Sequence, residues 1–452
     1  MHDLKITNAK IPDFSSNSFY LSDIVINKGK IEKIGTTNEY CKMEIDAEGN
    51  IASPGFIDIH MHEEELDMRL DDPYCTSYYA LLMGVTTNVG GNCGSNRQSL
   101  ACFSDYINKN GAPTNYMIFL GHNSLRSMVG INDRYRCANK SEINKMKEII
   151  RENKKYNYIG LSFGIEYSPG TSFDEMIGII SALEEDKYLL AAHYREDGEN
   201  SIEAIKELIE LSKTSKLPMQ ISHIGSCCAF GYMAEALEVI ENAIEHSIDV
   251  MADCYPYSAF ATAIGSAVFD EGCFERWNKT YSDILLLENP YRNARCSEEL
   301  FYKVRKQYPE MWAAAFVMNE KEIVDPIKSP YVLIGSDSSF RKDMGHPRGA
   351  GCYPRVLSYY VKEHKELTLI DALRKMTIGP AKRLKLKNKG DIFEGADADI
   401  VIFDKDTIKD KASFENPTLP PVGIEYVILN GEIAVNNNKI ISKRLGKYIK
   451  NC

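Results

Sequence analysis

The stretch PGFIDIHMHEE, residues 54–64, joins a short apolar segment to two histidines. Its Pro-Gly pair followed by FIDIH is typical of a buried strand. Residues two apart in a strand point to the same side, so His60 and His62 project together and Met61 projects away. Two imidazoles on one face at a strand end make half of a tetrahedral metal site. They could equally be a pair of hydrogen-bonded core histidines, and further ligands elsewhere would favour the metal.

Similar apolar segments recur along residues 56–390 and alternate with amphipathic helices such as SIEAIKELIELSKTS, residues 201–215. The expected strands are residues 55–61, 85–91, 115–121, 159–167, 189–195, 219–225, 249–257 and 331–337. About eight strand–helix units predict the α/β class with a (β/α)8 TIM-like barrel. A doubly wound open sheet is the alternative, and it is weakened because no GxGxxG follows a strand.

Both ends of the chain carry short alternating β segments, which neither end is large enough to bury alone. We therefore expect residues 1–55 and 391–452 to pair into one small β-sandwich domain, with two separate β appendages as the alternative. Residues 56–390 form the expected barrel. The stretch near 261–330 is longer than a strand–helix loop should be, and we expect a helical insertion there, over the barrel mouth.

The composition restricts the classes of partner and compartment. The net charge of -11 over 452 residues argues against a nucleic-acid or anionic-membrane partner. The sequence has no apolar run of ~18–20 residues for a membrane span and no apolar core of a signal peptide. Its 12 cysteines follow no disulfide framework spacing. These features predict a cytoplasmic protein with reduced thiols, and they leave its oligomeric state open.

Polar side chains stand at the ends of the expected strands, where barrel enzymes place their chemistry. They are His60, His62, Cys93, Glu166, His193, His223 and Asp337. Four of the 9 histidines thus accompany one thiol and an aspartate. Imidazole and thiolate suit zinc, although a lone buried Cys93 would be an ordinary small core residue. Taken together, the set predicts a zinc centre.

These motifs resemble those of the amidohydrolase superfamily and, within it, of the N-acyl-D-amino-acid deacylases, also called D-aminoacylases. The resemblance extends over essentially the whole chain, and GNCG and HPR with YPRVL are particular to this branch. The matching motifs are GFIDIHMH, GVTTNVGGNCG, GHNSLR, GLSFGIEYSPG, AAHYREDGENSIEAI, PMQISHIG, DCYPYSA, IGSD, HPRGAGCYPRVL, LRKMTIGPAKRLKL and GADADIVIFD.

The resemblance implies a zinc-dependent amide hydrolase that converts an N-acyl-D-amino acid and water into a D-amino acid and a carboxylate. Cys93, His193 and His223 match the residues that hold the tightly bound zinc, with Cys93 in the place of a bridging ligand. His60 and His62 match the pair that holds a second, weaker metal. The implied partner is therefore a small N-acyl amino acid substrate.

The resemblance also assigns residues to the reaction and the substrate. Asp337 matches the proton shuttle, which takes a proton from the attacking water and returns it to the leaving amine. Arg348 and Tyr255 match residues that hold the substrate's α-carboxylate, for which a planar guanidinium is suited. Arg348 could instead form a structural ion pair, and Tyr255 could be a core aromatic. His346, beside Arg348, either contacts substrate or orients its loop.

The chain departs from the family pattern at two positions. Gly225 stands where family members often carry a lysine that helps to bind the carboxylate, so one positive charge is missing. Many members of the superfamily bridge two metals with a carboxylated lysine at the end of the fourth strand, and this segment has Glu166 instead. Glu166 could bridge the metals itself, or it could pair with a cation such as Arg195.

Two rival functions stay open. The first is another reaction on the same scaffold, such as opening of a cyclic amide or cleavage of a dipeptide; enzymes of the former kind generally carry the strand-four lysine that is absent here. The second is a catalytically inactive scaffold, which loss of the ligands would reveal. The chain retains all of the expected ligands, which favours an enzyme.

Overall fold

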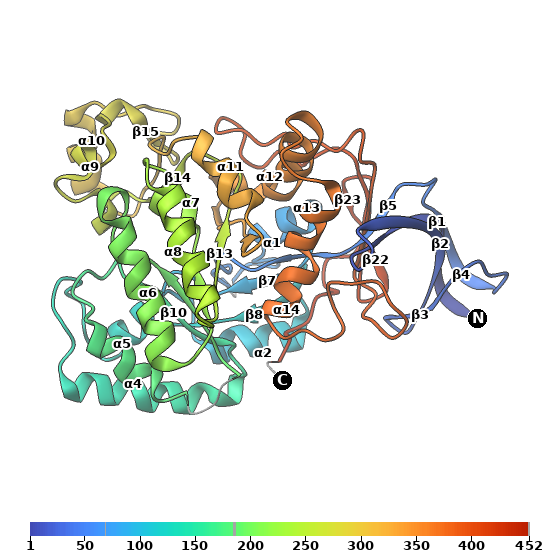
Figure 1. Cartoon of the computed structure of the whole chain (residues 1–452), viewed down its shortest axis with the longest axis horizontal. Helices are drawn as coiled ribbons and strands as arrows, with labels where there is room; N and C mark the ends of the chain where they lie inside the picture. The colour runs from blue at the N-terminus through green and yellow to red at the C-terminus, as the bar shows by residue number, and fades with distance from the viewer. Residues whose placement is uncertain (68, 184–186, 451–452) are drawn as a thin grey trace.

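The computed structural model describes residues 1–67, 69–183 and 187–450 and shows a mixed α/β protein (Figure 1). Its central parallel strands are β6 Phe56–Asp58, β7 Val85–Gly90, β8 Asn115–Ile118, β9 Leu120–Gly121, β10 Gly160–Gly164, β11 Leu189–His193, β12 Met219–Ile221, β13 Val250–Cys254 and β17 Val332–Ile334. Each lies within a segment for which the sequence predicted a strand. The third predicted strand is divided into β8 and β9.

The parallel strands pair in chain order, as β6-β7-β8 and as β9-β10-β11-β12-β13-β17. A backbone hydrogen bond of 2.9 Å from Ile159 N to Ile118 O joins the two groups. At their other edges, Asp337 N donates to His60 O at 2.7 Å and His62 N donates to Ser338 O at 2.9 Å. The segment after β17 therefore lies beside the segment after β6.

Helices connect the strands and cover them from outside, as α4, α5, α6 and α8 do in Figure 1. The helices are α1 Thr76–Leu82, α2 Leu100–Asn110, α3 His122–Met128, α4 Lys140–Asn153, α5 Phe173–Ile180, α6 Ser201–Ser215, α7 Ile224–Cys228, α8 Met233–Glu245, α11 Lys321–Lys328, α12 Arg348–Arg355, α13 Leu369–Met376 and α14 Ile378–Arg383, with the π-helix η5 Val356–Glu363. Helix α6 covers the residues predicted for it. It buries Ile202, Ile205, Leu208 and Ile209, because spacings of three and four place them on one face.

Between β13 and α11 the chain forms a lobe, at the upper left of Figure 1. It contains β14 Phe260–Ala263, β15 Ile284–Leu286, β16 Trp312–Ala315, α9 Cys273–Trp277 and α10 Glu298–Gln307. The strands form an antiparallel sheet in the order β14-β16-β15. The sequence predicted a helical insertion here, and it missed this sheet. Helix α11 packs on α7, α8 and β17, so it lies with the outer helices.

Strands from both ends of the chain pair in one sheet, at the right of Figure 1. They are β1 His2–Asp13, β2 Ser18–Asn27, β3 Lys30–Ile34, β4 Cys41–Asp46, β5 Ile51–Pro54, β20 Ile400–Phe403, β21 Ile424–Leu429, β22 Glu432–Asn436 and β23 Lys439–Ile440. The order is β23-β22-β21-β20-β5-β1-β2-β3, and β4 pairs with β1. Strand β5 is antiparallel to β20, with Ile51 opposite Phe403. The two ends are therefore not separate appendages.

Four apolar cores lie within the described residues. The largest lies between the central strands and the outer helices, and a second belongs to the sheet of the two ends, with Ile6, Ile24 and Ile400 fully buried. A third joins residues of the central strands, and a small one lies in the lobe. Burial of each such side chain contributes about 1.5–3 kcal/mol. Within the described residues, no helix has both the length and the apolar character that crossing a membrane requires.

Candidate metal centre

The side chains that were predicted to hold metal meet at the carboxyl ends of the parallel strands. Two groups of ligand atoms form there, each with all of its atoms within 4.8 Å of one another. One group is Cys93, His193 and His223, and the other is His60, His62, Cys93 and Asp337. Cys93 belongs to both groups, which is the arrangement that a shared ligand requires.

Three of these residues have a left-handed backbone, with φ of 51° at Cys93, 34° at His223 and 49° at Asp337. Each stands two or three residues after the last residue of its strand, β7, β12 or β17. Such a conformation costs a non-glycine residue about 1–3 kcal/mol and occurs often at functional sites. The fold therefore holds these three side chains in place against a local preference.

The sulfur of Cys93 lies 3.4 Å from His60 Nε2 and 3.4 Å from His223 Nε2. Burial raises the pKa of the thiol, but the charges of His60 and His223 outweigh it and hold the pKa well below its usual range. Nδ1 of His193 lies 3.0 Å from His223 Nε2. Burial lowers the pKa of His193, but hydrogen bonds with Cys93 and Glu166 raise it to about 9. A thiolate among ring nitrogens that face one another is a donor set that fits zinc.

Asp253, on β13, supports the cluster from behind and was missed in the sequence. Its Oδ1 lies 3.1 Å from His60 Nδ1 and accepts a hydrogen bond of 2.8 Å from His223 N. Burial lowers the pKa of His60, but the charges of Asp253 and Cys93 raise it well above the ordinary value. Carboxylates often orient metal-binding imidazoles in this way. The available signal was an acidic residue inside the apolar run that follows Asp249 in the expected strand 249–257.

Asp337 stands between the cluster and a buried arginine. Its Oδ1 lies 3.1 Å from His62 Nε2 and 3.6 Å from His60 Nε2, and its Oδ2 lies 2.7 Å from Arg348 Nη2. Burial raises the pKa of this carboxyl, but Arg348 and His62 hold it well below its usual range. The carboxyl is therefore ionised, and able to accept a proton, at neutral pH.

Arg348 lies with its guanidinium 4.5 Å from the centre of the Tyr255 ring. Nε and Nη1 of Arg348 and the hydroxyl of Tyr255 are buried, and none has a hydrogen-bond partner among the described residues. Buried donors without partners are costly, so this place fits a bound acceptor. His346 Nδ1 accepts a hydrogen bond of 3.0 Å from Arg348 N, and Nε2 lies 3.0 Å from Ala259 O. Both nitrogens of His346 thus have partners in the loop.

Glu166 lies outside both groups of ligand atoms. Its Oε2 is 2.7 Å from His193 Nε2, and its Oε1 is 3.9 Å from Arg276 Nη2. The alternative partner suggested by the sequence, Arg195, was wrong: its guanidinium pairs with Glu207 at 2.7 and 2.8 Å. To bridge two metals, the carboxylate of Glu166 would have to lie between the two groups of ligand atoms. The bridging role of Glu166 therefore stays a prediction.

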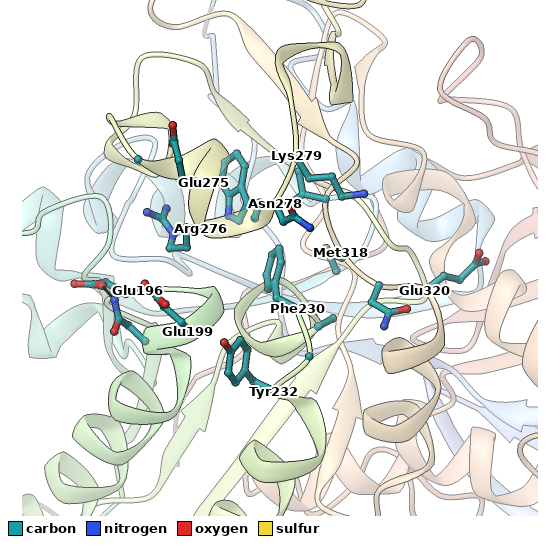
Figure 2. A pocket seen from close by; sticks show the side chains of 17 residues that line it. Glu196, Glu199, Phe230, Tyr232, Glu275, Arg276, Asn278, Lys279, Met318 and Glu320 are labelled. Atoms are coloured by element: carbon teal, nitrogen blue, oxygen red, sulfur yellow. Dashed lines mark hydrogen bonds between the residues drawn. The ribbon is translucent and has the colours of Figure 1, made fainter.

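Arg276 separates Glu166 from a surface hollow of about 920 Å³. Figure 2 shows this hollow, with Arg276 and Glu275 from the lobe on one side and Phe230 and Tyr232 facing them. Arg276 is held in place by an ion pair with Asp197. None of the cluster residues lines the hollow, so it lies outside the metal centre.

Gly225, where the resemblance suggested a lysine, packs against the side chains of Ile323, Cys254 and Met318. A Cβ atom at this glycine would lie 2.9 Å from Ile323 Cδ1 and 3.3 Å from both Cys254 Sγ and Met318 Cε. A lysine side chain would therefore start against apolar groups instead of pointing freely at the cluster. Gly225 is thus part of the contact between α7 and α11.

Known proteins of similar sequence and structure identify the family of this chain. The pattern of the Amidohydrolase family matches residues 51–434. The chain is 28% identical over 477 aligned positions to the D-aminoacylase of Alcaligenes xylosoxydans xylosoxydans, covering 99% of this chain and 97% of that one. A solved D-aminoacylase superposes with a TM-score of 0.89 at 25% identity, with both chains fully covered.

A second solved structure is the N-acyl-D-glutamate deacylase of Bordetella bronchiseptica, complexed with zinc and a phosphonate inhibitor that mimics the tetrahedral intermediate of its reaction. It superposes with a TM-score of 0.85 at 26% identity, with 99% of each chain covered. Together with the match over residues 51–434, these likenesses confirm the resemblance seen in the motifs. The chain belongs to the amidohydrolase family and is a hydrolase of amide bonds.

Proposed function

We propose that this protein is a zinc-dependent hydrolase that converts N-acyl-D-amino acids into a D-amino acid and a carboxylate. The observation that carries the proposal is the convergence of Cys93, His193 and His223 beside the ionised Asp337. The names of the relatives, a D-aminoacylase and an N-acyl-D-glutamate deacylase, indicate the class of substrate.

Cys93, His193 and His223 would hold the tightly bound zinc, and His60 and His62 with Cys93 would hold a second, weaker metal. When bound, zinc supplies an activated water and a positive charge for the carbonyl oxygen. Glu166, 2.7 Å from His193 Nε2, orients that imidazole, and Asp253 orients His60. Thiolate and imidazole ligands favour zinc over magnesium or calcium, which prefer oxygen.

Asp337 moves the proton in this proposal. Its carboxylate takes a proton from the water as the water oxygen attacks the carbonyl carbon. It then gives this proton to the amide nitrogen, the carbon–nitrogen bond breaks, and the amine leaves. The ion pair with Arg348 keeps Asp337 in its basic form before the reaction.

Arg348 and Tyr255 would hold the α-carboxylate of the substrate. The unpaired Nε and Nη1 of Arg348 lie on different edges of the guanidinium, and each can donate a charge-assisted hydrogen bond to a carboxylate oxygen. His346 would act by orienting the loop of Arg348, since both of its ring nitrogens are already occupied there.

We also propose the finer architecture. The hydrogen bonds between the segments after β6 and β17 support a closed (β/α)8 barrel over residues 56–390, with an insertion near 261–330. The sheet that joins residues 1–55 to 391–452 encloses its own apolar core, which supports a small β-sandwich domain. A cytoplasmic location is supported by the unpaired thiols of the described cysteines.

Hydrolysis of a panel of N-acetyl-D-amino acids and their L-enantiomers by zinc-loaded protein tests this function. We expect turnover of D members and little turnover of L members. Hydrolysis of cyclic amides or dipeptides instead would favour the other reactions of this scaffold. A protein that binds zinc but hydrolyses none of these would contradict the proposal.

A further inference from the structure

The cluster opens toward solvent through a second hollow of about 520 Å³, which we call the mouth. Its floor includes His62, Cys93, Asp337 and Arg348, so it leads directly to the reacting groups. Its charged rim is formed by Arg97, Arg134, Arg341 and Glu310. A protein of net charge -11 thus surrounds its active-site entrance with an excess of arginine.

The arginines of the mouth differ in how they are paired. Arg348 pairs with Asp337, and Arg126, which also lines the mouth, pairs with the buried Glu175. Arg97 and Arg134 have no carboxylate partner in the described part of the chain. The guanidinium of Arg97 reaches only Ser339 Oγ, at 3.5 Å, and that of Arg134 reaches Gly265 O at 3.2 Å.

Arg341 adds a third positive charge beside Arg97. It forms a long ion pair with Glu288, at 3.9 Å, and its Nη1 donates to Glu310 O at 2.8 Å. Burial lowers the pKa of Arg97, and the charge of Arg341 lowers it further, although Glu63 opposes this. Glu310 is the one acidic side chain on the rim and offsets part of this charge. Like charges held near each other in this way repel until an anion binds between them.

A smaller compartment also reaches Asp337 and shares Tyr167, Ala261 and Thr262 with the mouth. Its lining includes Tyr167, Phe260 and Val268, and its two further carboxylates are Glu166 and Asp197. It offers only about 20 Å³ of free space and no arginine, so a second anion has no place there. For a substrate whose amide lies at Asp337, the basic mouth is therefore the place that fits a second anion.

We propose that the preferred substrate carries a second carboxylate, besides its α-carboxylate, and that Arg97, Arg134 and Arg341 bind it in the mouth. This inference rests on the proposed function and refines it. The second carboxylate belongs either to the side chain of the amino acid or to a dicarboxylic acyl group. Both sources present the same chemistry to a guanidinium fork.

Two pairs of substrates that differ only in charge test the inference and distinguish the sources. The first pair is N-acetyl-D-glutamate and N-acetyl-D-glutamine, and the second is N-succinyl-D-methionine and its terminal amide. We expect the charged member of at least one pair to have a kcat/KM about tenfold higher, because one charge-assisted contact is worth that much. The pair that shows the preference identifies the source.

The Arg97→Gln and Arg134→Gln variants should bring this ratio toward one, mainly through KM. Arg97→Lys should keep part of it, since the charge remains. Arg292→Gln is the matched control: it removes a positive charge from the exposed surface of the lobe, outside the mouth, and should leave the ratio unchanged. Higher ionic strength should reduce the preference in the unmodified protein. Zinc content and circular dichroism check that each variant is folded.

Ratios at or below one for both pairs, with N-acetyl-D-methionine hydrolysed, would overturn this inference and leave the proposed function standing. If no N-acetyl-D-amino acid is hydrolysed, the proposed function fails. The preference of the mouth for a carboxylate is then tested by ligand binding instead of turnover. Calorimetry with glutarate and with its mono-amide should then show tighter binding of glutarate, and Arg97→Gln should remove the difference. Equal binding of both probes would reject a basic mouth that selects a carboxylate.

Discussion

Cys93 is the residue shared by both groups of ligand atoms, and its position depends on a glycine in the neighbouring strand. A Cβ atom at Gly164, the last residue of β10, would overlap the carbonyl oxygen of Cys93. Because that oxygen belongs to the backbone, it cannot turn away as a flexible side chain would. The close approach of β10 therefore fixes where the sulfur lies.

Gly164→Ala should accordingly displace Cys93 and weaken zinc binding by about 10- to 100-fold, the range found for residues that support metal ligands. Competition with a chromophoric chelator measures the affinity. Gly178→Ala is a suitable control, since the added methyl meets only the Cγ2 of Ile143, at 3.0 Å. Equal zinc affinities for the two variants would show that Cys93 does not depend on this contact.

Asp337→Asn tests the proton shuttle directly, because asparagine keeps the shape of aspartate and removes its basicity. We expect zinc to stay bound and kcat to fall by about 10²–10⁴-fold, the usual contribution of a general acid–base group. Metal analysis together with steady-state kinetics separates the two effects. Turnover at the rate of the unmodified protein would remove Asp337 from the mechanism.

The candidate ligands could be found from the sequence because their strand ends repeat one pattern, a polar residue after an apolar run. Asp253 could not be found in this way. An acidic residue inside an apolar run gives the same sequence pattern whether or not its side chain contacts a metal ligand. The predicted pairing of Arg195 with Glu166 was wrong for a related reason. Arg195 is close in sequence to His193, but the sequence does not show that its side chain points toward Glu207. Contacts between strands decide these cases.

At the scale of elements, the periodic helix α6 and the short parallel strands were predicted, whereas the short strands of the lobe were not. Helix α6 has four turns of regular spacing, and the structure begins and ends it at the predicted residues. In the lobe, β15 and β16 contain only 3 and 4 residues, ILL and WAAA, with no alternation of apolar and polar side chains. Such segments carry no strand periodicity, so the antiparallel sheet could be seen only in the structure.

Helix α13 contains a buried lysine whose titration should affect stability. Nζ of Lys375 donates to Val332 O at 2.8 Å and also contacts Ser329 O, and no carboxylate is paired with it in the described structure. Burial lowers its pKa from 10.5 to about 8. The unfolded chain therefore binds more protons between pH 8 and 10.5, and the free energy of unfolding should rise with pH across this window.

The full effect is roughly 3 kcal/mol, from 1.36 kcal/mol for each pKa unit. Urea unfolding of the unmodified protein and of Lys375→Met, over a series of pH values, isolates it from other titrations. The stability of the unmodified protein relative to the variant should increase as pH rises from 8 to 10.5. A constant difference between the two would mean that Lys375 keeps its ordinary pKa in the folded protein.

On the scale of the whole molecule, the alternation of strands and helices predicted the α/β class, and the matching texture of the two ends predicted their association. The sequence did not show that these ends share one continuous sheet, because the pairing of β5 with β20 joins residues about 350 positions apart, from Ile51 to Phe403. Pairing at such a distance is set by the register of the assembled fold. No local pattern specifies it.

The proposed metal centre would make a similar long-range connection, since its candidate ligands follow β6, β7, β12 and β17 or end β11. Removal of zinc by a chelator should therefore lower the melting temperature, because a bound metal stabilises the folded chain by about 4 kcal/mol at 1,000 times its Kd. Differential scanning calorimetry with and without chelator measures the shift, and added zinc should reverse it. Cys93→Ala should melt at nearly the same temperature under both conditions, because it lacks the ligand common to both groups. A shift in this variant as large as in the unmodified protein would place the stabilising metal elsewhere in the molecule.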